Sequence, residues 1–221
     1  MNILLIGASR GIGLEFARQY CEAGNRVIAT ARNAEGLARL EALGAETIKL
    51  DVVDPASISA LSWRLDGEKI DLAIYVAGVY ATQGAETPPT RQQFDYVMHT
   101  NVLGAMQAIP QVAPWVEEAL GTFAFISSGM GEIGGVESSF GWTYRVSKAA
   151  LNMAVACAQQ DYPKAAFVAL CPGWVRTDMG GSAAPLAVED SVASMRQALS
   201  QVKLKAQAQF LHHDGKPYSG W

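Results

Sequence analysis

Tyr144 and Lys148 are four residues apart in a stretch whose composition predicts a helix over Trp142–Tyr162. At that spacing two side chains share one face of a helix, and both tips can reach one ligand. A nearby ammonium favours the phenolate, so we expect the pKa of Tyr144 to fall below about 10. A tyrosine tuned in this way exchanges a proton with a carbonyl or an alcohol near neutral pH. The spacing alone is also common on ordinary helix surfaces.

Two further polar side chains are expected beside this pair. The strand predicted before the helix ends in Ile126-Ser127-Ser128-Gly129, so a serine hydroxyl lies at the carboxyl edge of the sheet. Ser128 would hold a substrate oxygen by a hydrogen bond, although the sequence leaves open whether Ser127 or Ser128 faces the substrate, and serine is also a common turn residue. Asn101 interrupts an otherwise apolar helix, where its amide would hold an ordered water.

A glycine-rich turn follows the first predicted strand, in Gly7-Ala8-Ser9-Arg10-Gly11-Ile12-Gly13. Glycine lets the backbone approach a pyrophosphate closely, and the N-terminus of the next helix offers N–H groups and partial positive charge. A tight turn without a ligand is the alternative, but the strand before and the helix after favour a phosphate site. The spacing G-x-x-x-G-x-G differs from the common dinucleotide fingerprint G-x-G-x-x-G.

Arginines occupy the positions that would recognise the adenosine ribose. NAD-binding proteins tend to place an acid after the second strand, whereas this chain has Arg32 there and a second arginine, Arg10, in the glycine turn. Two guanidinium groups suit a 2′-phosphate through charge-assisted hydrogen bonds, so we predict NADPH as the cofactor in preference to NADH. The alternative is that both arginines are merely solvated.

Other loops at strand ends complete the predicted site. Asp51 would accept a hydrogen bond from an adenine amino group or cap a turn before Pro55, and Thr177 would reach a carboxamide or phosphate. No cluster of metal ligands is present, and no metal is predicted. The residues expected to bind the cofactor are Gly7, Ser9, Arg10, Gly11, Ile12, Gly13, Arg32, Asp51, Val52, Ala77, Gly78, Tyr144, Lys148, Pro172, Gly173, Val175 and Thr177.

Alternating strand-like and helix-like segments must position these residues. The apolar runs predict strands at Ile3–Ile6, Arg26–Thr30, Glu46–Leu50, Leu72–Val76, Thr122–Ser127, Ala166–Leu170 and Gln207–Leu211. Helices are predicted at Ile12–Ala23, Ala34–Leu43, Pro55–Leu65, Thr90–Leu120 with a break, Trp142–Tyr162 and Ala187–Gln201. This repeat predicts an α/β fold with a doubly wound parallel sheet, in which ligands bind beyond the carboxyl ends of the strands.

Composition excludes several other classes of protein. Of the 221 residues, 50% are hydrophobic and 17% are charged, which is typical of one globular domain rather than a disordered chain. The net charge of −4, with no basic run, argues against nucleic acid or an anionic membrane as a partner. Three separated cysteines favour a reducing compartment, and no signal peptide or membrane span is evident, so we expect a soluble cytoplasmic protein.

These motifs together resemble the short-chain dehydrogenase/reductase family, in the C-factor and sniffer-like carbonyl reductase branch. The resemblance implies a single NAD(P)-binding Rossmann-type domain over residues 1–221, with seven parallel strands in the order 3-2-1-4-5-6-7 and helices on both faces. It also implies Tyr144 as proton donor, Lys148 as the residue that binds the nicotinamide ribose and tunes the tyrosine, Ser128 as the carbonyl anchor and Asn101 as support for a proton relay. One departure is Tyr75-Val76 where the family often has Asn-Asn.

The resemblance implies a small carbonyl or alcohol substrate, bound by loops at residues 79–89, 129–142 and 174–186. Their aromatic and apolar side chains favour an apolar or aromatic carbonyl compound, and residues 134–139 are expected to form a lid or rim. A homodimer or homotetramer through helices at 102–120 and 142–162 is expected. The alternative function is a nucleotide-binding sensor or signalling protein of the same fold. A sugar-nucleotide epimerase is disfavoured because the chain lacks room for its larger substrate domain.

Overall fold

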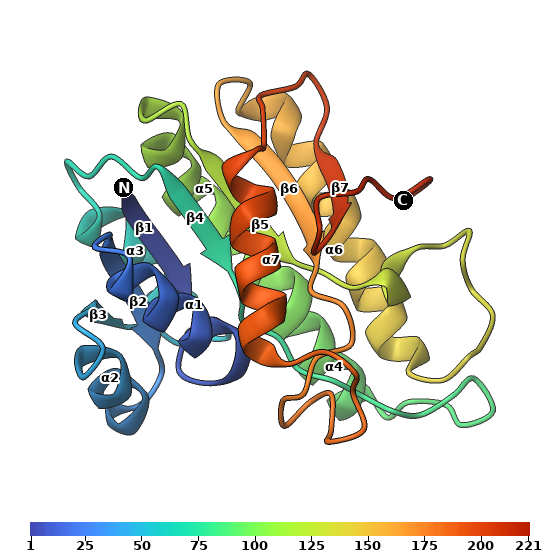
Figure 1. The fold of residues 1–221 in the computed structure, drawn as a ribbon. Helices are drawn as coiled ribbons and strands as arrows, with labels where there is room; N and C mark the ends of the chain where they lie inside the picture. Colours follow the sequence, from blue (N-terminus) through green and yellow to red (C-terminus); the bar gives the residue numbers. More distant parts are fainter.

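The computed structural model describes residues 1–221 and contains one seven-stranded parallel sheet, in the order β3-β2-β1-β4-β5-β6-β7 (Figure 1). The strands are β1 (Asn2–Ile6), β2 (Arg26–Ala31), β3 (Glu46–Lys49), β4 (Leu72–Tyr75), β5 (Thr122–Ile126), β6 (Ala166–Cys171) and β7 (Gln209–His212). The helices are α1 (Gly11–Glu22), α2 (Ala34–Glu41), α3 (Pro55–Arg64), α4 (Arg91–Met98), α5 (Gly104–Glu118), α6 (Trp142–Asp161) and α7 (Val188–Ser200). The expected α/β fold and strand order are confirmed.

Both faces of the sheet are covered, so the central strands are apolar on both sides. Successive residues of β1 point to opposite faces: Leu4 joins the core beneath α3, α5 and α6, whereas Ile3 joins the core beneath α1, α2 and α7. Figure 1 shows α1 and α7 on the near face of the sheet. This double coverage explains why most strands read as continuous apolar runs.

The helix predicted over Thr90–Leu120 is interrupted by a π-helical turn. Segment His99–Leu103 joins α4 to α5 with wider hydrogen-bond spacing, and the carbonyl of Thr100 accepts a bond of 3.0 Å from the buried Tyr75 hydroxyl. Glycine is required at position 104, directly after this turn, because a Cβ there would lie 2.6 Å from the same hydroxyl oxygen of Tyr75. Such turns occur often at functional sites, and Asn101 lies within this one.

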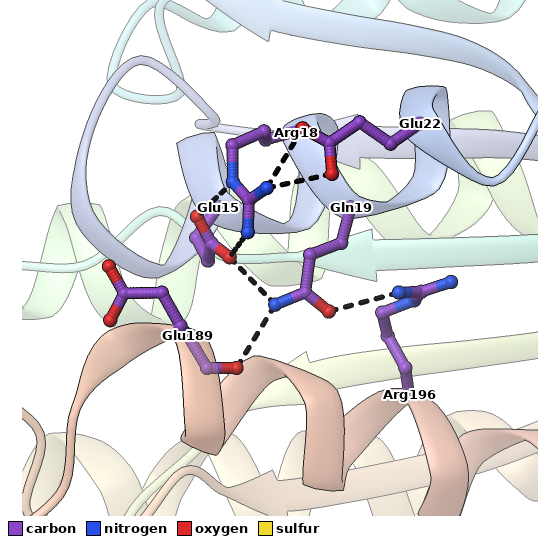
Figure 2. A network of polar contacts seen from close by, with 6 residues as sticks. All are labelled: Glu15, Arg18, Gln19, Glu22, Glu189 and Arg196. Atoms are coloured by element: carbon purple, nitrogen blue, oxygen red, sulfur yellow. Dashed lines mark hydrogen bonds and ion pairs between the residues drawn. The ribbon is translucent and has the colours of Figure 1, made fainter.

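A polar network joins α1 to α7 (Figure 2). The Gln19 amide donates to the Glu15 carboxylate at 2.7 Å and to the Glu189 carbonyl at 3.0 Å, while its oxygen accepts from Arg196 at 2.9 Å. Because α1 begins at the glycine turn and α7 follows the loop after β6, this network joins the two helices that are next to these cleft-lining loops. No helix is both long and apolar enough to cross a bilayer.

Candidate active site

The glycine turn leaves the start of α1 open to a ligand. Gly7 has a φ of +85°, and a Cβ there would lie 2.6 Å from that of Ala77, so glycine is required where β1 and β4 end side by side. Arg10 precedes α1, but no side chain caps the helix. The first N–H groups of a helix have no partner within it, so those of α1 can bind an anion.

A cleft runs along the carboxyl ends of the strands from Arg32 past the glycine turn to Tyr144. Predicted residues that line it are Gly7, Ser9, Arg10, Gly11, Ile12, Arg32, Asp51, Val52, Ala77, Gly78, Tyr144, Lys148, Pro172 and Thr177. Gly13, Asn101, Ser128, Gly173 and Val175 do not line it. Gly13 is instead required for packing, because a Cβ there would lie 2.7 Å from the Ala8 Cα.

Tyr144 and Lys148 are both buried on one face of α6, at one end of this cleft. The Lys148 ammonium lies 5.5 Å from the centroid of the tyrosine ring. It donates a hydrogen bond of 2.8 Å to the Ile126 carbonyl. Burial lowers the pKa of Lys148 to about 8. Burial also raises the pKa of Tyr144 well above its usual value, and a hydrogen bond with Ser128 offsets only part of that rise.

This result differs from the expectation that the neighbouring ammonium would lower the pKa of Tyr144. Desolvation disfavours the charged form of each side chain, so the phenol becomes a weaker acid and the ammonium a stronger one. The lysine also directs its ammonium to a backbone carbonyl rather than to the phenol oxygen. In the protein without ligands, the tyrosine therefore keeps its proton throughout the neutral pH range.

The two serines at the end of β5 have different partners. Ser127 is buried and donates 2.6 Å to the Asn152 side chain on α6. Ser128 lies close to Tyr144, and its hydroxyl oxygen accepts a 3.1 Å hydrogen bond from the Met130 amide at the start of a 3₁₀ turn. Ser127, in contrast, lines the cleft, so the two alternatives for the serine that faces the substrate both stay predictions.

Asn101 connects three segments through its amide. Its oxygen accepts 2.8 Å from the Val79 amide, and its nitrogen donates 2.9 Å to the Val79 carbonyl and 2.9 Å to Ser147. Ser147 lies between the tyrosine and the lysine on α6. Asn101 therefore holds the start of the loop after β4 against the reactive helix, and its predicted bond to a water stays a prediction.

The adenosine end of the cleft carries the predicted charged residues. Arg10 and Arg32 line it and are exposed, and Arg10 forms a 3.3 Å ion pair with Asp178 across the cleft. Asp51 accepts 3.1 Å from the Val53 amide and so caps a turn, which is the second of the two roles expected for it. Its carboxylate also lines the cleft.

The loop after β6 closes over the glycine turn. Thr177 accepts 3.1 Å from the Gly180 amide, and its methyl group lies 3.5 Å from where a Cβ of Gly11 would be. Val175 pairs with Leu186 as an isolated bridge and is buried, which is why it does not reach the cleft.

Aromatic side chains form the wall beside the tyrosine. Tyr80 packs edge-to-face on Tyr144, with ring centroids 4.7 Å apart, and Phe140 approaches Tyr80 at 6.4 Å. Trp174 and Met179 are exposed on the loop after β6. These are the side chains that the sequence placed on the substrate loops.

Two groups of residues that contact the predicted site were missed by sequence reasoning. Asn152 lies four residues after Lys148, a spacing that could have suggested a third polar residue on the same face of α6. Cys171 and Tyr218 both lie close to Gly129, next to Ser128, although they are far apart in the chain. No local signal in the sequence identifies that second group.

Several known proteins are similar to this chain in sequence or in fold. The family described as short chain dehydrogenase matches residues 1–186. The C-signal of Myxococcus xanthus is 36% identical over 118 residues, which cover 52% of this chain and 71% of that protein. The carbonyl reductase Sniffer of Drosophila melanogaster has a TM-score of 0.92 and 27% identity, covering 100% of this chain and 99% of the other.

A carbonyl reductase of Pseudomonas aeruginosa in complex with NADP has a TM-score of 0.87 and 30% identity, covering 100% of this chain and 99% of the other. The family match spans most of the chain, and the fold agrees with both solved structures along their whole length. The chain therefore belongs to the short-chain dehydrogenase/reductase family of oxidoreductases.

Proposed function

We propose that the protein is an NADPH-dependent reductase that converts an aldehyde or ketone to an alcohol. The observation that carries this proposal is the cleft itself: Tyr144 and Lys148 are buried at one end, and Arg10 and Arg32 line the other. A dinucleotide would extend between these two ends. The carbonyl reductases among the similar structures, one of which binds NADP, support the same conclusion.

The residues present fit a nicotinamide dinucleotide. The uncapped start of α1 would hold the pyrophosphate, Arg10 and Arg32 the 2′-phosphate, and Lys148 the nicotinamide ribose. The close approach of Gly7 to Ala77 leaves no side chain in the path of the phosphates. When bound, the reduced dinucleotide supplies the hydride that a carbonyl carbon accepts.

Tyr144 is the proton donor in this proposal. Its raised pKa keeps the hydroxyl protonated near neutral pH, which is the state that a carbonyl oxygen needs from a general acid. Ser128, which lies close to the same hydroxyl, would orient the substrate oxygen towards it. After proton transfer, the Lys148 ammonium lies close enough to stabilise the phenolate.

We infer an apolar or aromatic carbonyl compound as the substrate class. Tyr80 and Phe140 form an aromatic wall next to the proton donor. Arg176 does not favour a charged substrate, because its guanidinium is already engaged by backbone carbonyls. It donates hydrogen bonds of 3.2 Å to Ala184 and 2.9 Å to Pro185. An apolar wall with few polar groups is typical of sites for small apolar ligands.

A second candidate function is a signalling protein that binds the dinucleotide without turning it over. The similarity to the C-signal of Myxococcus xanthus favours this alternative. A sensor of this kind needs the glycine turn but has no use for a buried tyrosine and lysine with aligned polar partners. The intact group of Tyr144, Lys148 and Ser128 therefore favours the reductase.

Consumption of NADPH with a panel of aldehydes, ketones and diketones tests the proposal. We expect turnover of aromatic or apolar carbonyls by the parent, and a decrease of about a hundredfold or more in kcat for Tyr144→Phe. The dissociation constant for NADPH should be nearly the same in both. Tight NADPH binding with no turnover of any carbonyl would favour the signalling alternative.

A further inference from the structure

The C-terminal residues run back along β7 and contact the loop that follows β5. Leu211 and Pro217 form an antiparallel bridge, and the Tyr218 amide donates 2.9 Å to the Phe210 carbonyl. The chain end then reaches the turn after Ser128, where the Ile133 amide donates 3.2 Å to the carbonyl of Trp221. Figure 1 shows the C-terminus on the same side of the molecule as this loop.

Tyr218 is held rigidly between two other rings. Its ring stacks on Phe210, with centroids 3.9 Å apart and planes at 9°, and on His212, with centroids 3.7 Å apart and planes at 15°. Phe210 and His212 are two residues apart on β7, so their side chains lie on the same face with space for one ring between them. The hydroxyl of Tyr218 therefore has a fixed position.

That hydroxyl lies against the residue that follows Ser128. A Cβ on Gly129 would be 2.7 Å from the Tyr218 oxygen, so only glycine fits there without displacing the ring. The same hydroxyl also lies close to the Cys171 thiol. The sulfur of Cys171 in turn accepts 3.1 Å from the Gly129 amide. Tyr218, Cys171 and the Gly129 backbone thus form one connected contact at the end of β5.

Gly129 cannot move without changing the orientation of its neighbour. Ser128 precedes the 3₁₀ turn Gly129–Gly131; its hydroxyl oxygen accepts a hydrogen bond from the Met130 amide, and its side chain lies close to Tyr144. A second contact from the tail, in which Ser219 donates 3.3 Å to Glu132, holds the residue after that turn. The backbone on the far side of Ser128 is therefore fixed by the last residues of the chain.

We propose that Tyr218 is a positioning residue for the reduction, which acts through Cys171 and Gly129 to aim the Ser128 hydroxyl at Tyr144. This role rests on the proposed reductase function. Tyr218 itself does not line the cleft, so its loss should lower kcat while the affinity for NADPH stays unchanged.

The Tyr218→Phe variant removes the hydroxyl and keeps the ring between Phe210 and His212. We expect kcat for a reactive carbonyl to fall about fivefold, as for the loss of one weak polar contact, with an unchanged Kd for NADPH. Tyr162→Phe is the matched control, because Tyr162 also stacks on a core ring, Phe167, but lies at the far end of α6. That control should retain the kcat of the parent.

A double-mutant cycle with Ser128→Ala separates positioning from general destabilisation. If Tyr218 acts through Ser128, adding Tyr218→Phe to Ser128→Ala should produce almost no further decrease in kcat. The same fivefold decrease in both backgrounds would contradict the proposal, because it would place the effect of Tyr218 elsewhere.

A third measurement is independent of turnover. Hydrogen exchange of residues 129–133 should be faster in Tyr218→Phe than in the parent and in Tyr162→Phe. An active parent whose Tyr218→Phe variant has unchanged kcat and unchanged exchange would overturn the positioning role alone. A parent that turns over no carbonyl would overturn the reductase function, and with it the catalytic role of Tyr218, while the exchange rates would still show whether the tail holds this loop.

Discussion

Burial raises the pKa of Tyr144 and lowers the pKa of Lys148, and both shifts suit carbonyl reduction. A buried tyrosine with a raised pKa retains its proton until a nearby charge or a developing alkoxide draws it away. A buried lysine with a pKa of about 8 is near the point of losing its charge in the free protein. A bound anion would restore that charge, so occupation of the cleft would prepare the lysine to stabilise the phenolate.

The affinity for NADPH should therefore decrease as the pH rises through about 8, the pKa of Lys148 in the free protein. Below that pH the ammonium is present and binds the nicotinamide ribose of the negatively charged dinucleotide more strongly than the neutral amine does above it. Nearby Cys171 acts to keep the pKa of Lys148 higher. Calorimetric titrations at pH 7 and pH 9 measure the change. Lys148→Met should bind more weakly with a flatter pH profile, and an equally steep profile in that variant would exclude Lys148 as the origin.

Arg32 should distinguish NADPH from NADH. Its exposed guanidinium lines the adenosine end of the cleft, where no acidic side chain follows β2. Arg32→Ala should raise the Kd for NADPH about tenfold or more, the cost of a lost charge-assisted bond, and leave that for NADH unchanged. Arg39→Ala is the control, because Arg39 is a neighbouring arginine paired with Glu35 outside the cleft. Equal losses for both cofactors would contradict 2′-phosphate recognition.

At the scale of elements, the contact between α1 and α7 supports both sides of the cleft. Gln19 is buried between the two helices, where its amide donates a hydrogen bond to Glu15 and accepts one from Arg196 (Figure 2). A hydrogen bond from Arg18 lowers the pKa of Glu15, so this carboxylate stays charged at neutral pH. Removal of the amide would take away its hydrogen bonds with Glu15, the Glu189 carbonyl and Arg196.

Gln19→Ala should lower the free energy of unfolding by about 1–3 kcal/mol, the cost of unpaired buried polar groups. Urea denaturation at pH 7 measures this change, with Gln197→Ala, an exposed site on α7, as the control. Because the pKa of Glu15 is lowered on folding, its contribution is present above its ordinary pKa of 4.5 and is lost as the pH falls through the lowered value. A variant as stable as the parent would show that the network is dispensable.

Some elements could be predicted from the sequence and others could not, for physical reasons. The strands are short apolar runs between turns, so their positions follow from the sequence and their ends differ by one or two residues. The π-helical turn at His99–Leu103 depends on contacts of Asn101 and Thr100 with distant segments, which no local pattern contains. The raised pKa of Tyr144 likewise depends on burial that the Tyr-Lys spacing does not reveal.

At the scale of the whole molecule, one sheet brings residues from both ends of the chain to a single edge. The glycine turn follows β1, the serines follow β5, and Cys171 ends β6, so the parallel order places them together. The glycine turn and the Tyr-Lys pair could be recognised from motifs. Tyr218 could not, because its role depends on the tail folding back along β7.

We predict that a homodimer or homotetramer covers exposed apolar side chains on α5, α6 and the turn before α5. These are Leu103, Met106, Val146 and Met153, which are 41–65% exposed. Light scattering after size exclusion should give an oligomer for the parent and a smaller species for Met153→Asp. Trp63→Asp, an exposed apolar site on α3, is the control. A monomeric parent would contradict the prediction.

In the proposed reaction, Tyr144 protonates a carbonyl oxygen while the carbon receives a hydride from NADPH held in the cleft. Transfer of label tests this mechanism, with NADPH that carries deuterium at both hydrogen positions of the reactive nicotinamide carbon and an aromatic ketone as acceptor. We predict that the parent forms an alcohol with one deuterium on the carbinol carbon, and that Tyr144→Phe binds NADPH equally well but forms almost no alcohol. Unlabelled alcohol from the parent, or equal amounts of alcohol from both proteins, would contradict this mechanism.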